Sequence, residues 1–347
     1  MLLLHDMKQW IKRKGTVYTV IGLFIALVIM AAIIVFFTGG SPRKAVIMIP
    51  PGATEASVRD TLAKYYGDAY AGRVMQGASF IGGKLHEKPG LYDIEEGTSL
   101  WRVIWRLNGR RQTPVKFTIN NQRTRQDIVN AVAQKFYFTP EALDSVLNDA
   151  DEMAEYGLTP ENATALFLNN THEALWSNDP KRVVHRIGKA YNQFWTDERK
   201  AKAAKLNLKP EEVIIIASIA EEESTHADER GRIGRLYINR LQKGMRLQAD
   251  PTVRFAMNDF TIRRVGRDML MVESPYNTYR HEGLPPAPIR TVEPATVDAI
   301  LNSAPSEDLY MCAKPDFSGS HNFAKTYEEH QRNAKDYADA LDKRGIQ

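Results

Sequence analysis

The 347-residue chain contains a single cysteine, Cys312, so no intramolecular disulfide can form. It also lacks a His-Glu-x-x-His zinc motif, a Gly-x-Ser-x-Gly nucleophile motif and a glycine-rich phosphate-binding loop. These absences disfavour metal-dependent, serine-nucleophile and nucleotide-dependent chemistry, and we expect neither a metal ion nor an organic cofactor. The formal net charge of +4 is too small to indicate a nucleic-acid partner.

Long uncharged hydrophobic runs are absent except for one, from Val17 to Phe37. A run of about 20 apolar residues can cross a bilayer as a helix. Four basic residues precede it, namely Lys8, Lys12, Arg13 and Lys14. Because basic flanks stay on the cytoplasmic side, we expect a single-pass anchor in the cytoplasmic (inner) membrane, a cytoplasmic tail at 1–16, a linker at 38–44 and an extracytoplasmic remainder. A cleaved signal peptide is the alternative.

Between residues 45 and 136 one pattern recurs three times: an apolar strand, a turn of small or polar residues, a threonine and an amphipathic helix. The expected strands span residues 46–49, 91–94 and 115–119. Thr54, Thr98 and Thr124 are placed to cap the helices that follow, since a threonine hydroxyl can accept a free backbone N–H of the first turn. The pattern indicates an α+β fold.

A segment that is apolar except for Ser218, from Val213 to Ala220, ends abruptly in three consecutive glutamates. Pro210 and two acidic residues stand ahead of it, which is typical of the first turn of a helix. Val and Ile also favour strands, so a buried strand is the alternative. The alanines, the proline and Ser218 favour a buried helix over 210–223.

Glu223 would occupy a special position on this helix. One and two turns behind it lie Ile219, Ala220 and Ile216, so its helix face is apolar. The neighbouring carboxylates and the negative end of the helix dipole also favour the protonated form. A carboxyl group that stays protonated near neutral pH can act as a general acid. The alternative is a solvated helix end with no catalytic role.

Further motifs follow in order, which are Asn239-Arg240-Leu241, Leu247-Gln248-Ala249-Asp250-Pro251-Thr252, Tyr276-Asn277-Thr278-Tyr279 and Gly283-Leu284-Pro285-Pro286. Together with the segment from Ala217 to Ser224, this series resembles the endolytic murein transglycosylases of the MltG (YceG-like) family, from about residue 209 to the C-terminus. The family's catalytic glutamate directly precedes a Thr or Ser, and Glu223 holds that position here. Glu221 matches the family's other glutamate.

The resemblance implies lytic cleavage of the β-1,4 bond between N-acetylmuramic acid and N-acetylglucosamine, with a 1,6-anhydro end as product. One acid/base is enough for that scheme, whereas hydrolytic glycosidases usually need two carboxyl groups. Substrate-binding or supporting roles would fall to Glu221, Asn239, Gln248, Asp250, Tyr276, Asn277, Tyr279 and His321. From the residues alone, Asp250 could equally be a turn residue, Asn239 a surface residue and Glu221 a salt-bridged one.

The segment from Tyr92 to Trp101 is similar to the start of a LysM repeat, a small peptidoglycan-binding module. We therefore expect a LysM-like module at 45–111 and a YceG-like catalytic domain at 112–347, with its core motifs at 209–330. Tyr92, Trp101 and Trp105 suggest a glycan-binding surface, and the alternative is that the tryptophans are core residues. The chain departs from the family pattern at Leu168-Asn169-Asn170-Thr171, where Asn170 and Thr171 are candidates to replace a Pro-Asp pair.

These features predict a membrane-anchored lytic transglycosylase that cuts nascent glycan strands and so terminates their elongation. Its partners would be peptidoglycan strands and the peptidoglycan synthases of the elongation and division machinery. Two other functions stay open, a muramidase that hydrolyses the same bond and a non-catalytic membrane-anchored protein that binds peptidoglycan.

Overall fold

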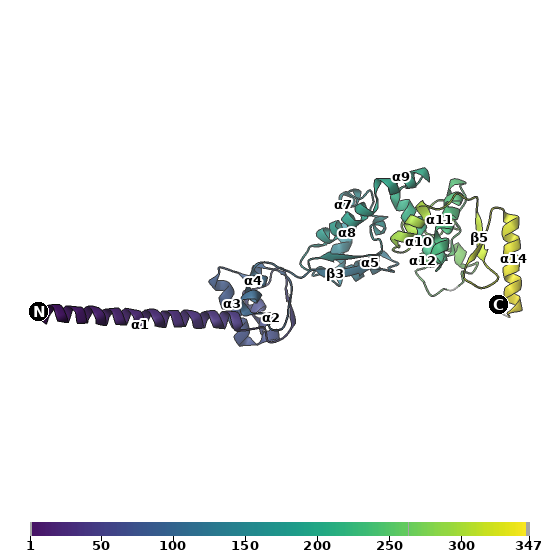
Figure 1. The fold of residues 1–347 in the computed structure, drawn as a ribbon. Helices are drawn as coiled ribbons and strands as arrows, with labels where there is room; N and C mark the ends of the chain where they lie inside the picture. The colour runs from purple at the N-terminus through teal and green to yellow at the C-terminus, as the bar shows by residue number, and fades with distance from the viewer. Residues whose placement is uncertain (1, 263, 345–347) are drawn as a thin grey trace. The chain divides into compact units, whose positions relative to one another are not determined.

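The computed structural model describes residues 2–262 and 264–344. Met1, Arg263 and residues 345–347, which belong to the expected tail and catalytic domain, lie outside the described residues. Two compact units divide the chain, Met1–Val115 with Leu175–Ser177, and Lys116–Ala174 with Asn178–Gln347. The fold is α+β and mostly helical, and the described residues form three two-stranded sheets (Figure 1).

The expected membrane helix is part of α1, Leu2–Thr38. Within the described part of the chain, its segment Lys14–Ala32 is the one stretch long and apolar enough to cross a bilayer. The side chains described there are exposed, as those of a lipid-facing helix would be. Length and composition thus fit either a single-pass anchor or a signal sequence.

The rest of the first unit is a small α+β module built around one antiparallel strand pair. Its elements are β1 Ala45–Ile49, α2 Glu55–Tyr66, α3 Asp68–Phe80, η1 Leu85–Glu87, β2 Gly90–Ile94 and α4 Leu100–Asn108. Ile47 of β1 lies opposite Tyr92 of β2. Both are fully buried, and the Tyr92 hydroxyl donates to the carbonyl of Lys88. Tyr92 therefore belongs to the core, and its expected place on a glycan-binding surface is wrong.

The tryptophans of α4 lie on the opposite face from its core residues. Leu100, Val103, Ile104 and Leu107 are buried, as expected for an amphipathic helix. Trp105 is 46% exposed and stacks edge to face on the half-buried Trp101, with ring centroids 5.5 Å apart. Trp105 is therefore not a core residue, and its ring is open to a ligand.

Two of the three expected threonine caps are present. The Thr54 hydroxyl accepts from the backbone N–H of Ser57 at the start of α2, and Thr124 accepts from Asp127 at the start of α5. Thr98 does not cap α4, which begins one residue later with Ser99 at the N-cap position. Instead the Thr98 hydroxyl donates to the Glu95 carbonyl at 2.7 Å, because the turn closes on itself before the helix starts.

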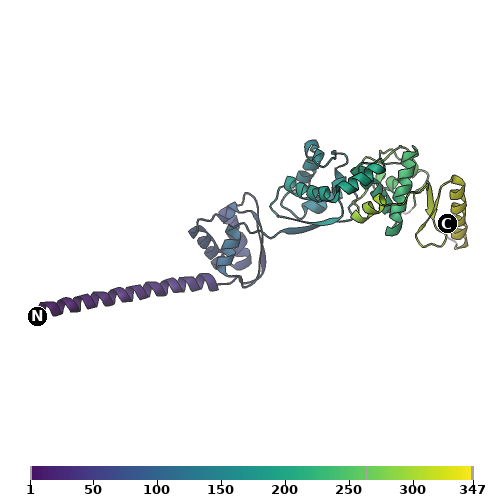
Figure 2. The ribbon, with the colours of Figure 1, turned by 45° about the horizontal axis from the view of Figure 1, so that its top comes forward.

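The second unit contains the remaining elements. They are β3 Val115–Ile119, α5 Arg125–Ala133, α6 Pro140–Leu147, α7 Ala150–Ala154, η2 Ala163–Leu166, β4 Asn170–Ala174, α8 Pro180–Phe194, α9 Asp197–Lys205, α10 Pro210–Glu223, α11 Ala227–Gln242, α12 Asp250–Ala256, η3 Met269–Met271, α13 Pro294–Leu301, β5 Tyr310–Ala313, β6 His321–Ala324 and α14 Tyr327–Lys343. Strand β3 pairs with β4, and β5 pairs antiparallel with β6. Figure 2 shows α14 lying beside this last pair, which it contacts.

Helix α10 is the centre of the second unit, and its expected bounds are confirmed. Every residue from Val213 to Ala220 is buried, and α9, α11, α12, α13 and η2 all contact the helix. The polar residue in this segment is also satisfied within the core: the Ser218 hydroxyl donates to the Ile215 carbonyl and accepts from the backbone N–H of Ile289. A helix that is apolar on all sides is stable only when neighbours surround it.

Helix α11 begins at Ala227, and Asp228 and Glu229 in its first turn favour a helix start because they lie at the positive end of the helix dipole. Two glycines on this helix let it approach α13 closely. A Cβ on Gly234 would lie 2.5 Å from Ile300 Cγ1, and one on Gly231 would lie 2.7 Å from the Ala299 carbonyl oxygen. Side chains at these positions would push the two helices apart.

Candidate active site

The last residue of α10 lies in a cleft of about 400 Å³. The helix ends at Glu223 because Ser224 is extended, and the chain turns into α11, which packs against α10. This turn brings Tyr237 to Glu223, and the tyrosine hydroxyl donates to Glu223 Oε1 at 2.6 Å. Glu223 is partly exposed, so its carboxyl group can be reached from the cleft.

Burial of the carboxyl group is the main cause of a raised pKa at Glu223, about 7 against an ordinary value of 4.5. The hydrogen bond from Tyr237 lowers the pKa of Glu223, whereas the negative charge of Asp250 raises it. Burial also holds the pKa of the Tyr237 hydroxyl well above 10, so this group stays a donor near neutral pH. Glu223 can therefore give up and take back a proton at neutral pH.

The two preceding glutamates point into the protein and are bound by arginines. The Glu221 side chain is 1% exposed, accepts the backbone N–H of Glu293 at 2.8 Å and lies within 4 Å of Arg290 and Arg230. Glu222 pairs with Arg290 at 2.8 Å and with Arg123 at 3.2 Å. The like charge that raises the pKa of Glu223 thus comes mainly from Asp250 and only weakly from the adjacent Glu222.

The loop before α12 places two more polar residues in the cleft. Gln248 has a left-handed backbone with φ of +51°, which is uncommon for a residue other than glycine. Its side-chain oxygen accepts from Arg240 Nη2 at 2.6 Å, and its backbone N–H donates to the Thr278 carbonyl. Asp250 is the first residue of α12, not part of a turn, and accepts from the Tyr279 hydroxyl at 2.5 Å.

The β5–β6 pair and the start of α14 complete the cleft with aromatic and imidazole rings. His321 begins β6 and is held by Glu229, whose carboxylate accepts from both the backbone N–H and the ring Nδ1 of His321. Tyr310 stacks on His330 with ring centroids 5.3 Å apart. The rings of His321, Tyr310, His330 and Tyr327 line the same cleft as Glu223.

Five of the nine expected site residues come together in this cleft, which are Glu223, Gln248, Asp250, Tyr279 and His321. The other four hold the structure around it. Asn239 donates to the carbonyls of Ser306 and Asp308, and the buried Asn277 donates to those of Leu270 and Val272. Tyr276 packs on Phe255, and Glu221 is ion-paired as described above.

The segment Leu168-Asn169-Asn170-Thr171, where the chain departs from the family pattern, also lies outside the residues that line the cleft. Asn170 and Thr171 are exposed at the start of β4, and the Thr171 hydroxyl shares a hydrogen bond with Thr118 of β3. Asn169 donates through its backbone to Val292 and through its side chain to Glu293. In this chain the segment therefore links strand β4 to the residues ahead of α13.

The profile of the YceG-like family matches residues 47–336. The chain belongs to the YceG-like family. An endolytic murein transglycosylase of Bacillus subtilis (strain 168) is 28% identical over 263 residues, which cover 72% of each protein. Another, from Streptococcus pneumoniae, is 27% identical over 143 residues, or 39% of this chain and 25% of that protein. A crystal structure of a YceG-like protein from Listeria monocytogenes shares the fold, with a TM-score of 0.53, 22% identity, and coverage of 84% of this chain and 98% of that one.

Sequence reasoning missed Tyr237, the hydrogen-bond donor to Glu223 in this YceG-like protein. A signal was present, because Ile233, Leu236 and Tyr237 share one buried face of α11, and the tyrosine brings a hydroxyl group to that face. Tyr310, Tyr327 and His330 were missed as well. They lie outside the motifs that carry the family resemblance, and only the folded structure brings them to Glu223.

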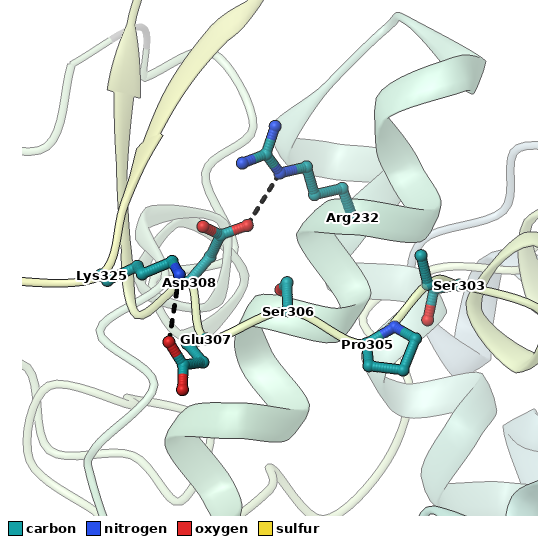
Figure 3. Close-up of a pocket in the computed structure, with 8 residues that line it drawn as sticks. Arg232, Ser303, Pro305, Ser306, Glu307, Asp308 and Lys325 are labelled. Atoms are coloured by element: carbon teal, nitrogen blue, oxygen red, sulfur yellow. Dashed lines mark hydrogen bonds and ion pairs between the residues drawn. The ribbon is translucent and has the colours of Figure 1, made fainter.

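A second hollow, of about 570 Å³, is larger than the cleft but is lined by charges that neutralise each other (Figure 3). Arg232 donates to Asp308 at 2.8 Å, and Lys325 lies 3.1 Å from Glu307. These four side chains are held in ion pairs, whereas the smaller cleft holds the partly exposed Glu223 with its pKa of about 7. The cleft at the end of α10 is therefore the candidate active site.

Proposed function

We propose that this protein is a lytic transglycosylase that cleaves the β-1,4 bond between N-acetylmuramic acid and N-acetylglucosamine in peptidoglycan. One observation carries the proposal: a carboxyl group with a pKa of about 7, partly exposed in a polar and aromatic cleft and hydrogen-bonded to Tyr237. An acid/base works best when its pKa lies near the working pH. The names of the Bacillus and Streptococcus relatives support the same activity.

In the proposed reaction, protonated Glu223 gives its proton to the glycosidic oxygen as the bond from that oxygen to muramoyl C1 breaks. The carboxylate that forms accepts the Tyr237 hydrogen bond and then takes the proton of the muramoyl C6 hydroxyl. The C6 oxygen bonds to C1 and closes the 1,6-anhydro ring. The proton is back on Glu223, no water is consumed, and a second catalytic carboxylate is not required.

Polar groups around Glu223 are suited to orienting the sugars. Arg240 donates to the side-chain oxygen of Gln248. The NH2 group of the same amide makes no hydrogen bond within the described residues. It is thus available to donate to an N-acetyl carbonyl or a hydroxyl oxygen. The rings of Tyr279, Tyr310 and His321 offer flat faces for sugar rings along the cleft.

For the whole chain, we propose that α1 anchors the protein in the cytoplasmic membrane, with residues 45–111 as a LysM-like module and 112–347 as the catalytic domain outside the cytoplasm. Such an enzyme would cut strands as they emerge from peptidoglycan synthases and so terminate their elongation. The apolar segment Lys14–Ala32 and the family membership support this assignment.

A hydrolytic muramidase is the second candidate, and Asp250 is the observation that favours it. Its carboxylate lines the same cleft as Glu223, and hydrolysis usually needs two carboxyl groups. In the structure, however, Asp250 accepts the Tyr279 hydroxyl at 2.5 Å, a contact that would hold its carboxylate away from a water molecule.

Mass spectrometry of the products separates the two functions. The full chain in detergent is incubated with purified glycan strands, beside the Glu223→Gln variant as control. Lytic cleavage leaves 1,6-anhydro ends, while hydrolysis leaves reducing muramic acid ends with the mass of one added water. Reducing ends alone would replace the proposal by the muramidase, and no product of either kind would favour a binding protein.

A further inference from the structure

The end of the proposed membrane helix is fixed to the start of α4 by backbone hydrogen bonds. The N–H of Leu100 donates to the Gly39 carbonyl at 2.8 Å, and the N–H of Ser41 donates to the Thr98 carbonyl at 2.8 Å. Gly40 and Ser99 form a β-bridge. Helix α4 therefore begins where the chain leaves α1.

This connection keeps the side chains of α4 near the membrane surface. A helix rises about 1.5 Å per residue, so the nine residues of α4 extend only about 13 Å from that junction. The backbones at Gly40 and Gly97 are in close contact, since a Cβ on Gly40 would lie 3.0 Å from the Gly97 backbone. With α1 spanning the bilayer up to this junction, the start of α4 lies at the depth of the lipid headgroups.

Beside α4 is a hollow of about 540 Å³, lined by Thr98, Arg102, Trp105, Arg106, Arg111 and Gln112. We call it the α4 pocket. Three of its six residues are arginines, and the segment from Leu100 to Arg111 contains no acidic residue.

Two arginines of the α4 pocket are available for a ligand. Arg102 and Arg111 are exposed and make no side-chain hydrogen bond or ion pair to any described residue. Arg106 donates one N–H to the Thr113 hydroxyl and keeps its other donors. The turn before α4 carries two acidic residues: Glu95, which pairs with Lys44 at 2.7 Å, and the exposed Glu96.

We propose that the α4 pocket binds the phosphate headgroup of an anionic phospholipid in the membrane that holds α1. A guanidinium group donates two parallel hydrogen bonds to a phosphate, so Arg102 and Arg111 match that ligand. Trp105 adds the ring and the indole N–H that make tryptophan frequent at the level of lipid headgroups. This proposal rests on the anchoring function proposed for α1, and it makes the first unit a membrane-surface module as well as a link to the catalytic cleft.

The test measures shielding of Trp105 in the full chain reconstituted in lipid nanodiscs. Acrylamide, a neutral quencher, is titrated against tryptophan fluorescence, and the Trp105→Phe variant is subtracted to isolate the signal of Trp105. Discs of phosphatidylcholine alone are compared with discs that contain increasing fractions of phosphatidylglycerol. We expect phosphatidylglycerol to lower the quenching constant of Trp105 at least threefold.

Paired variants separate a specific pocket from general charge attraction. Arg102→Ala with Arg111→Ala should weaken the binding to phosphatidylglycerol discs by about tenfold or more, so that shielding stays below half-maximal at the lipid fraction that half-shields the parent, since each basic residue near an anionic surface contributes about fivefold in affinity. Arg59→Ala with Arg73→Ala removes the same charge from α2 and α3 and should leave the shielding unchanged.

Three outcomes would overturn the proposal. They are no shielding by phosphatidylglycerol, equal loss in both double variants, or the same shielding in phosphatidylcholine discs by inorganic phosphate or by soluble peptidoglycan fragments. The last result would assign the α4 pocket to a free phosphate or to glycan. Glycan cleavage is not measured in this test, so a negative result for the α4 pocket leaves the proposed activity intact. If the protein is absent from the disc fraction, the anchoring proposed for α1 has failed instead.

Discussion

The Tyr237 hydroxyl and the Glu223 carboxylate are joined by a 2.6 Å hydrogen bond that connects the end of α10 to the middle of α11. The hydrogen bond and burial have opposite effects on the pKa of Glu223. Burial raises this pKa, and a donor to the carboxylate lowers it. Asp250, in the same cleft, adds a negative charge that favours the proton. The balance leaves the group able to act both as acid and as base.

Replacing Glu223 by Gln should lower the rate of anhydro-end formation by about 10²- to 10⁴-fold, the usual range for loss of a general acid-base group. The amide keeps the size of the side chain but cannot give up a proton. Glu222→Gln is the matched control, since it makes the same chemical change one residue earlier, on a side chain that pairs with Arg290 and Arg123. It should keep most of the rate, and an inactive Glu222→Gln with an active Glu223→Gln would reassign the acid.

Activity should fall as the pH rises through about 7, because the first step requires protonated Glu223. In Tyr237→Phe the carboxylate loses a donor, so the pKa of Glu223 should rise and the alkaline limb of kcat/KM should move up by about one pH unit. The rate at the optimum should drop, about tenfold, because the carboxylate that forms during the reaction is less stabilised. An unshifted limb would exclude Tyr237 from setting the proton affinity of Glu223.

Glu223 should also make the folded protein less stable at higher pH. Its folded-state pKa is raised, so the native state holds a proton that the unfolded chain has already released between pH 4.5 and about 7. The free energy of unfolding should therefore decrease across this window, while Glu223→Gln removes that decrease. We expect the variant to gain roughly 1–3 kcal/mol relative to the parent between pH 4.5 and pH 8. Parallel denaturant titrations at several pH values measure the difference, and a constant difference would contradict the raised pKa.

Glu221→Gln tests the separate function of the other glutamate. Its buried carboxylate lies against Arg290 and Arg230 and accepts the N–H of Glu293, so the amide leaves the half-buried Arg230 without its carboxylate partner, while Arg290 keeps Glu222. We expect a loss of roughly 3 kcal/mol in the free energy of unfolding, with an unchanged alkaline limb of the pH profile. Glu211→Gln, in the first turn of α10, is the control and should cost only about 0.5 kcal/mol. A shifted limb in Glu221→Gln would show that this residue does act on the acid.

The sequence could predict α10 and its chemistry because the information is local: a proline at the start, a run of mostly apolar residues and a carboxyl group on an apolar face. It could not predict the hydrogen bond from Tyr237, which depends on how α11 packs on α10. The same limit applies to α4, where helical spacing shows that Trp101 and Trp105 lie near each other but not which side of the helix is covered. Asn239 and Asn277 match family motifs, yet only their partners in the fold show that they brace loops.

Gly231 and Gly234 lie on the side of α11 that contacts α13, yet the same helix carries Tyr237 and Arg240 into the cleft. Any side chain larger than hydrogen at either glycine would shift the helix as a body and carry both cleft residues with it. Loss of cleavage would then follow from substitutions that leave every sugar-facing group chemically intact. A genetic screen for inactive variants should accordingly find two separate clusters of substitutions, one in the cleft and one where α11 contacts α13.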